Sequence, residues 1–196
     1  EIGVRLVGSE MCIRDRDTEC MDIAGINHQT WVMKTVREQV ERHYRVGSTR
    51  ESRFVAGWST GGYCAANLTS KYPLDFNAGF ALAGYYHPTF EGSALSKATP
   101  QLIADNSPLA RVKAGNVDSR VRFLSVMSKR DRSTWGDVDN PLMLNGQVWS
   151  DGQDFWNHAH ALKQYEFIVL GQGGHGTGTY VPYLGQCLRW LGQFGL

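Results

Sequence analysis

The sequence predicts an α/β fold in which a mainly parallel sheet is covered by helices on both faces. Short and nearly continuous apolar runs alternate along the chain with longer segments whose apolar residues recur at helical spacing. No internal repeat and no low-complexity linker interrupts this alternation. A chain of 196 residues is also long enough to bury a sizeable core in one domain. These observations favour strands that are buried on both faces.

The first half of the chain contains two predicted helices and two predicted strands. Residues 30–44 place valines four positions apart between charged side chains, which is the stripe of an amphipathic helix. Residues 53–58, RFVAGW, have the length and the apolar character of a buried strand. The small-residue segment 60–72 predicts a helix that Pro73 stops, and residues 78–86, AGFALAGYY, predict a second buried strand.

The second half continues the pattern after a long irregular stretch. Residues 87–110 are rich in loop-forming residues, and we expect an insertion that covers a substrate there. Residues 120–128 predict a third strand, and residues 165–170, YEFIVL, predict a fourth. Helical spacing occupies residues 151–163 between these strands and residues 180–194 near the end of the chain.

Composition and charge exclude several classes of partner. Twenty basic residues stand against nineteen acidic ones without a long run of either sign, which argues against nucleic acid or an anionic membrane as a partner. No stretch reaches the roughly 18 consecutive apolar residues that a membrane span needs, and the first residues lack the apolar core of a signal peptide. The cysteines have no CxxC spacing, so they predict neither a zinc knuckle nor a redox pair: Cys12, Cys20, Cys64 and Cys187.

Residues 1–16 differ in character from the rest of the chain. They show neither helical nor alternating periodicity, and the part GSEMCIRDR resembles the translation of sequencing-adapter readthrough. We therefore expect residues 1–16 to be a non-native leader, the native protein to begin at about Asp17, and Cys12 to have no structural role. A genuine but irregular leader is the alternative.

The segment GWSTG fits the pattern GxSxG between a predicted strand and a predicted helix. In that context Ser59 is the candidate nucleophile of a sharp strand-to-helix turn, and Gly57 and Gly61 let backbone and helix approach closely. A serine hydroxyl is a weak nucleophile at neutral pH, so it needs a base within hydrogen-bond reach and a third group that orients the base. The backbone N–H of Thr60 is then the candidate oxyanion donor. An ordinary strand-to-helix turn is the alternative.

His175 is the strongest candidate for the base, because it follows the last predicted strand within the glycine-rich segment GQGGHGTG. Ligands of parallel sheets bind at the carboxyl ends of the strands, where this histidine is expected. His87 also follows a strand, but it reads more simply as a structural histidine than as a pocket residue. The remaining histidines lack such placement: His28, His43, His158 and His160.

The orienting acid should come between the serine and the histidine in chain order. Asp131 is the first choice, because it stands three residues beyond the predicted strand that ends at Ser128. Asp137 and Asp139 share the same polar loop and are the reserves. Ordinary solvated carboxylates are the alternative for all three.

A competing motif is present but incomplete. Gly171, Gly173 and Gly176 match GxGxxG after a strand, yet no acidic residue follows Glu166, and no further strand follows the last helix. We therefore assign these glycines to the histidine loop. The chain contains neither GxxxxGK nor HExxH, and we expect no metal and no organic cofactor.

With these residues placed, the chain from residue 17 onward resembles the esterase family of α/β hydrolases that holds esterase D and the antigen 85 mycolyltransferases, in particular its actinobacterial members. The resemblance rests on DTECMD, GWSTGGYCAANL with KYP after it, GYYHP and GGHGTGTYVPYL. It implies Ser59 as nucleophile, His175 as base and Asp131 as acid. It also implies ester hydrolysis or acyl transfer through an acyl-enzyme without a cofactor. Many actinobacterial members are exported or membrane-attached, which implies an extracytoplasmic location for the full-length protein.

The chain departs from this family in front of the serine. About a hundred or more residues usually precede such a serine, whereas 58 precede Ser59. We therefore expect residues 17–196 to form the carboxyl-terminal part of a single domain, a partial α/β-hydrolase fold whose front strands are missing. The loop with the second oxyanion donor would be missing too, and losing one donor typically costs about 10²- to 10³-fold in rate. We expect the visible chain to be weakly active or inactive.

The leading functional hypothesis is a serine esterase that cleaves carboxylic esters of small molecules, lipids or sugars. An acyltransferase with the same three residues is the nearest alternative, because the shape of the pocket decides whether water or a sugar hydroxyl accepts the acyl group. A non-catalytic binding or scaffold module is the alternative from another class, since a fold does not secure a function.

Overall fold

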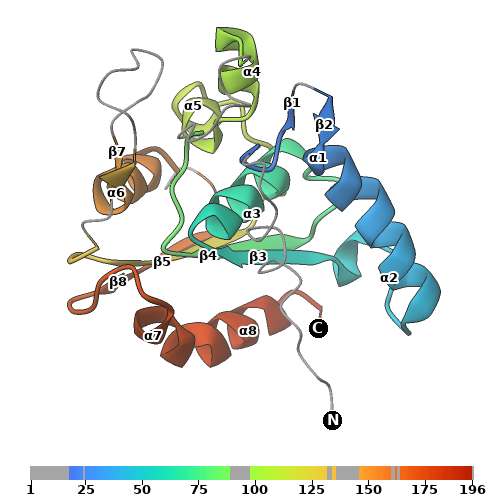
Figure 1. The fold of residues 1–196 in the computed structure, drawn as a ribbon. Coiled ribbons are helices and arrows are strands. Elements are labelled where there is room, and N and C mark those ends of the chain that lie inside the picture. Colours follow the sequence, from blue (N-terminus) through green and yellow to red (C-terminus); the bar gives the residue numbers. More distant parts are fainter. Residues whose placement is uncertain are drawn as a thin grey trace.

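The computed structural model describes residues 18–23, 25–88, 98–131, 134–135, 146–159, 162 and 164–195. At its centre lies a four-stranded sheet in the order β3-β4-β5-β8, and all neighbouring strands are parallel (Figure 1). The strands are β3 (Phe54–Trp58), β4 (Ala78–Leu82), β5 (Phe123–Ser128) and β8 (Tyr165–Leu170). The predicted mainly parallel sheet is confirmed.

Helices cover both faces of this sheet, as the sequence predicts (Figure 1). One face carries α3 (Thr60–Lys71) and α6 (Val148–Ala159). The other carries α7 (Thr177–Tyr180), a 3-10 turn (Val181–Tyr183) and α8 (Leu184–Gly192).

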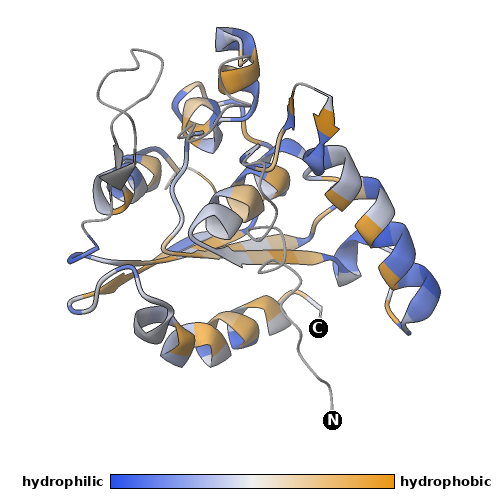
Figure 2. Ribbon diagram, in the orientation of Figure 1, coloured by the Kyte–Doolittle hydropathy of each residue, from blue (hydrophilic) through white to orange (hydrophobic). Residues whose placement is uncertain are grey.

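Apolar side chains on the inner faces of the helices hold them to the sheet. In α8, Cys187, Trp190 and Leu191 recur at helical spacing and are buried, and the apolar side of α8 in Figure 2 faces the strands. All residues of β4 and β5 are buried, as expected for the central strands of a sheet that is covered twice. None of the helices among the described residues is long and apolar enough to cross a membrane.

The predicted amphipathic helix of residues 30–44 forms in three pieces. A short α1 (His28–Thr30) passes through a π-helical segment η2 (Trp31–Val36) into α2 (Arg37–His43). Smaller elements complete the described chain: β1 (Asp22–Ile23), β2 (Ile26–Asn27), a 3-10 turn (Arg50–Ser52), β6 (Thr134–Trp135) and β7 (Gly146–Gln147).

Two expectations about residues 78–110 need correction. The strand predicted over residues 78–86 ends at Leu82, because Ala83 adopts a positive φ of 51° that extended backbone cannot continue. The stretch predicted as loop contains α4 (Pro100–Asp105) and α5 (Pro108–Lys113). Each begins with a capping hydroxyl followed by proline, and Thr99 and Ser107 are these caps. Residues 89–97, within the predicted insertion, lie outside the described residues.

A disulfide joins Cys20 to Cys64, across 44 positions of sequence. Cys64 lies in the first turns of α3, five residues after Ser59. The bond therefore fixes the chain ahead of β1 against the helix that follows the candidate nucleophile. The cysteine spacing gave no indication of this pair.

Candidate active site

Ser59 occupies the turn between β3 and α3 with φ 56° and ψ −122°, a region that side chains other than glycine rarely adopt. Hydrogen bonds hold this backbone: Ser59 N–H donates to the Leu82 carbonyl at 2.9 Å, and Tyr63 N–H donates to the Ser59 carbonyl at 3.0 Å. A Cβ atom on Gly57 would collide with the backbone of Gly61, whereas a Cβ on Gly61 would meet no atom within 4 Å. The close approach therefore requires glycine at the first of the two positions.

The three side chains that the sequence singles out meet at the carboxyl ends of the strands. His175 Nε2 lies 2.8 Å from Ser59 Oγ, and His175 Nδ1 lies 2.9 Å from Asp131 Oδ2. Ser59 follows β3, Asp131 follows β5 and His175 follows β8. Asp131 is fully buried, whereas His175 is partly exposed. With the proton on Nδ1, the imidazole donates to the carboxylate and accepts the serine hydroxyl proton at Nε2.

Side chains from two strands restrain the glycine-rich loop that carries His175. Trp58, the last residue of β3, donates from Nε1–H to the His175 carbonyl oxygen at 3.1 Å, and its ring lies 5.0 Å from the imidazole. Ser128, the last residue of β5, donates from Oγ–H to the Gln172 carbonyl at 3.1 Å. A loop rich in glycine is thereby held in one conformation over the serine.

No model of a known protein family and no curated protein sequence matches the chain, but solved structures do. A ferulic acid esterase matches with a TM-score of 0.70 and 21% identity, over 88% of this chain and 63% of that one. An S-formylglutathione hydrolase from Agrobacterium tumefaciens matches with a TM-score of 0.67 and 16% identity, over 86% of this chain and 57% of that one. MPT51 of Mycobacterium tuberculosis matches with a TM-score of 0.63 and 17% identity, over 87% of this chain and 70% of that one. The chain has an α/β-hydrolase fold.

At 16–21% identity these likenesses establish the fold and nothing finer. The chain spans about three fifths of the length of the first two proteins. In an α/β-hydrolase fold, loops at the carboxyl ends of the strands carry the functional side chains. That is the edge at which Ser59, Asp131 and His175 meet.

The candidate oxyanion donor, Thr60 N–H, belongs to the first residue of α3, where backbone N–H groups have no partner within the helix. A buried chain of hydrogen bonds orients the same residue. Tyr85 Oη lies 3.1 Å from Thr60 Oγ1 and 3.2 Å from the buried carboxylate of Glu19. The Tyr85 hydroxyl is the donor in both contacts, so its single proton is shared between Thr60 Oγ1 and the Glu19 carboxyl oxygen. Glu19 precedes the cysteine whose disulfide fixes this segment on α3.

The other histidines and acids lie apart from this arrangement. His87 Nδ1 bonds to Asp151 Oδ1 at 2.6 Å, and both side chains are buried, which agrees with the structural interpretation of His87. His43 and His158 are themselves exposed, and their imidazoles bond to backbone carbonyls of their own helices. The imidazole of His28 bonds to the Thr18 hydroxyl. Three further predicted residues lie outside the described part of the chain: Asp137, Asp139 and His160. The described residues contain no group of three or more His, Cys, Asp or Glu side chains that could share a metal ion.

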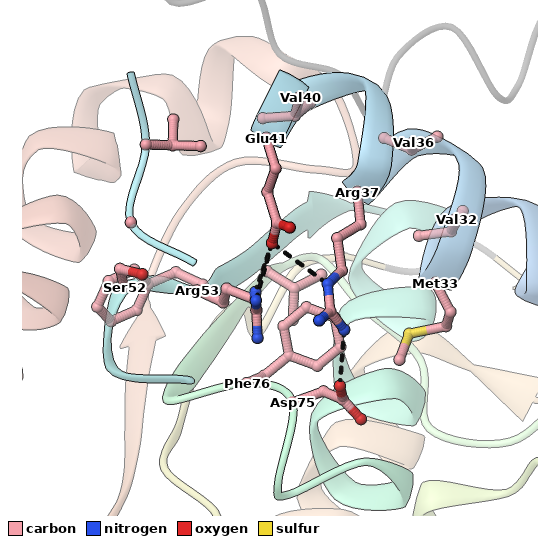
Figure 3. Close-up of a pocket in the computed structure, with 14 residues that line it drawn as sticks. Val32, Met33, Val36, Arg37, Val40, Glu41, Ser52, Arg53, Asp75 and Phe76 are labelled. Carbon is pink, nitrogen blue, oxygen red and sulfur yellow. Dashed lines mark hydrogen bonds and ion pairs between the residues drawn. The ribbon is translucent and has the colours of Figure 1, made fainter. Parts of the chain in front are cut away.

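A pocket of about 270 Å³ lies beside β3 (Figure 3), and its lining includes none of Ser59, Asp131 and His175. The valines predicted as the apolar stripe of the first helix line it, together with aromatic side chains from β3 and from the turn after α3: Val32, Val36, Val40, Phe54 and Phe76. Ion pairs cross its mouth, from Arg53 to Glu41 at 2.8 Å and from Arg37 to Asp75 at 3.0 Å (Figure 3).

Proposed function

We propose that the chain is a serine esterase in which Ser59 is the nucleophile, His175 the general base, Asp131 the orienting acid and Thr60 N–H an oxyanion donor. The observation that carries this proposal is the continuous hydrogen-bonded chain from Ser59 Oγ through His175 to Asp131, at 2.8 and 2.9 Å. The strained backbone at Ser59 and the α/β-hydrolase fold of the solved esterases support it further.

The proposed reaction proceeds by acylation and deacylation. His175 Nε2 takes the Ser59 hydroxyl proton while Oγ attacks the acyl carbon, and Thr60 N–H stabilises the oxyanion of the tetrahedral intermediate. The intermediate collapses as the imidazolium gives its proton to the leaving alkoxide, which departs as the alcohol. Water then attacks the acyl-enzyme and gives a proton to His175, which passes it to Ser59 Oγ as the carboxylic acid leaves. Asp131 stabilises the imidazolium in both halves.

Covalent labelling tests this proposal most directly. A fluorophosphonate should label the chain at Ser59, and S59A and H175A should lose labelling, because an unactivated serine hydroxyl does not react. The matched control is S119A, which removes an exposed serine hydroxyl and should label like the wild type. Labelling of the wild type that S59A or H175A retains would contradict the proposed roles of these residues.

The substrate class requires a panel of esters. p-Nitrophenyl acetate is a general probe of ester hydrolysis, and the named activities of the solved structures suggest two more: a methyl ester of ferulic acid and the thioester S-formylglutathione. Product analysis with trehalose present would distinguish transfer to a sugar hydroxyl from transfer to water. The same assays measure the turnover of the chain and so test the prediction that it is weak.

A further inference from the structure

Tyr180 lies outside the Ser59–His175–Asp131 chain but bonds directly to it. Its side chain is fully buried in α7, five residues after His175. Its phenol oxygen lies 3.0 Å from Asp131 Oδ2, the same carboxylate oxygen that faces His175 Nδ1 at 2.9 Å. The acid is therefore contacted by two side chains of the segment that follows β8.

The direction of these hydrogen bonds is set by their chemistry. Ser128 N–H can only donate, and it donates to the phenol oxygen of Tyr180 at 3.3 Å. The single phenol proton is then directed to the Asp131 carboxylate. Burial, followed by the charge of Asp131, raises the pKa of Tyr180 far above its ordinary value. The phenol thus stays a neutral donor throughout the working pH range of an esterase.

The same contacts join the two loops that carry the acid and the base. Asp131 N–H donates to the Ser128 carbonyl at 3.1 Å, so the turn with the acid is anchored on the last residue of β5. The Ser128 hydroxyl donates to the Gln172 carbonyl at 3.1 Å in the loop that carries His175. Tyr180 closes this arrangement by bonding to both Ser128 and Asp131.

We propose that Tyr180 is a positioning residue of the candidate triad. Its phenol holds the Asp131 carboxylate toward His175 and reduces the electrostatic stabilisation that this carboxylate gives to the imidazolium. Two donors on one oxygen share its negative charge, so the imidazolium is stabilised less than by a carboxylate without the phenol. The effect on rate rests on the esterase function proposed above, whereas the effect on the titration of His175 does not.

The experiment compares Y180F with Y183F. Tyr183 lies three residues further on, half-buried, and takes no part in the hydrogen bonds to Asp131 and His175 that are described above. We expect Y180F to lower kcat/KM about tenfold, because losing one hydrogen bond to a charged group typically changes an equilibrium or a rate by about that factor. The acidic limb of its pH profile should move up by about half a pH unit. NMR titration should show the same rise for the His175 imidazole, and Y183F should match the wild type within twofold.

Two further variants separate positioning from simple packing. Replacing Tyr180 with 3,5-difluorotyrosine keeps the ring and strengthens the donor, so the His175 titration should move to lower pH, opposite to Y180F. The fluorinated protein also tests whether the Tyr180 phenol acts on His175 if Y180F does not fold. In a D131A background, Y180F should change kcat/KM by less than twofold, because the phenol acts through the carboxylate.

The outcomes distinguish the two proposals. Fluorophosphonate labelling that persists in S59A contradicts the proposed nucleophile, while the NMR titration still tests Tyr180. A His175 titration that stays the same in Y180F and in the fluorinated protein overturns the role of Tyr180, even if the esterase is active.

Discussion

At the carboxyl end of the sheet, polar side chains are bonded in series from the partly buried Ser59 through the partly exposed His175 to the fully buried Asp131. Along the outer side of β3, polar side chains instead stand at the mouth of an apolar pocket (Figure 3). There Arg53 and Glu41 pair while partly exposed to water. Strand β3 therefore borders two different regions. At its carboxyl end hydrogen bonds fix the geometry of the side chains, and along its outer side ion pairs are weakened by contact with water.

The comparison teaches where polar interactions matter in this molecule. A buried carboxylate such as Asp131 is costly without its partners, so each hydrogen bond to it constrains geometry strongly. A partly exposed ion pair such as Arg53–Glu41 exchanges its partner for water at little cost. Substitutions at the two places should therefore differ greatly in effect.

The largest expected effect is that of D131N. The amide would hold His175 in the wrong tautomer for accepting the serine proton, so we expect kcat to fall about 10³- to 10⁴-fold. The measurement is ester hydrolysis at pH 7, with D105N, at an exposed carboxylate, as the matched control. A loss below tenfold would assign the acid to another residue of the loop, such as Asp137 or Asp139.

The double variant C20A/C64A tests the covalent link beside the site. In the loop-entropy model, a disulfide across 44 positions lowers the entropy of the unfolded chain and so raises the free energy of unfolding by about 4 kcal/mol. We expect a loss of about that size in the free energy of unfolding, measured by urea denaturation under oxidising conditions. Adding a reductant should destabilise the wild type and leave the double variant unchanged. If the reductant affects neither protein, the bond contributes no stability.

The smallest effect is expected at the pocket. The hydrogen bond from Arg53 lowers the pKa of Glu41, so its stabilising contribution is present above the unfolded pKa and is lost as the pH falls through the folded pKa. Thermal unfolding should show E41Q less stable than the wild type at pH 7, and the difference should shrink below about pH 4.5. E38Q, at an exposed position of α2, is the control. An equal difference at both pH values would contradict the assignment.

The sequence predicts those features of this fold that depend on local patterns. Apolar runs identify the four strands, although only β4 and β5 are buried throughout, whereas the edge strands β3 and β8 are partly exposed. The positions of Ser59, Asp131 and His175 after three of these strands predict their proximity, since parallel strands end at one edge. The capping pairs before α4 and α5 were present in the sequence and would have predicted both helices.

Other features depend on contacts between distant segments, which local patterns do not encode. The end of β4 follows from the backbone of Ala83, a residue with no intrinsic preference for positive φ. The partner of Cys20 and the place of Tyr180 beside Asp131 follow from packing in three dimensions. A tyrosine in a short terminal helix otherwise looks like an ordinary core residue.

The backbone of Ser59 also bears on the history of the chain. An L-amino acid in this conformation costs about 1–3 kcal/mol, and glycine at the same place would relieve most of that cost. A lineage in which position 59 had no chemical task would gain stability by drifting to glycine. That this chain carries a serine rather than a glycine at so strained a place supports a chemical use of the hydroxyl, independently of the distances to His175 and Asp131.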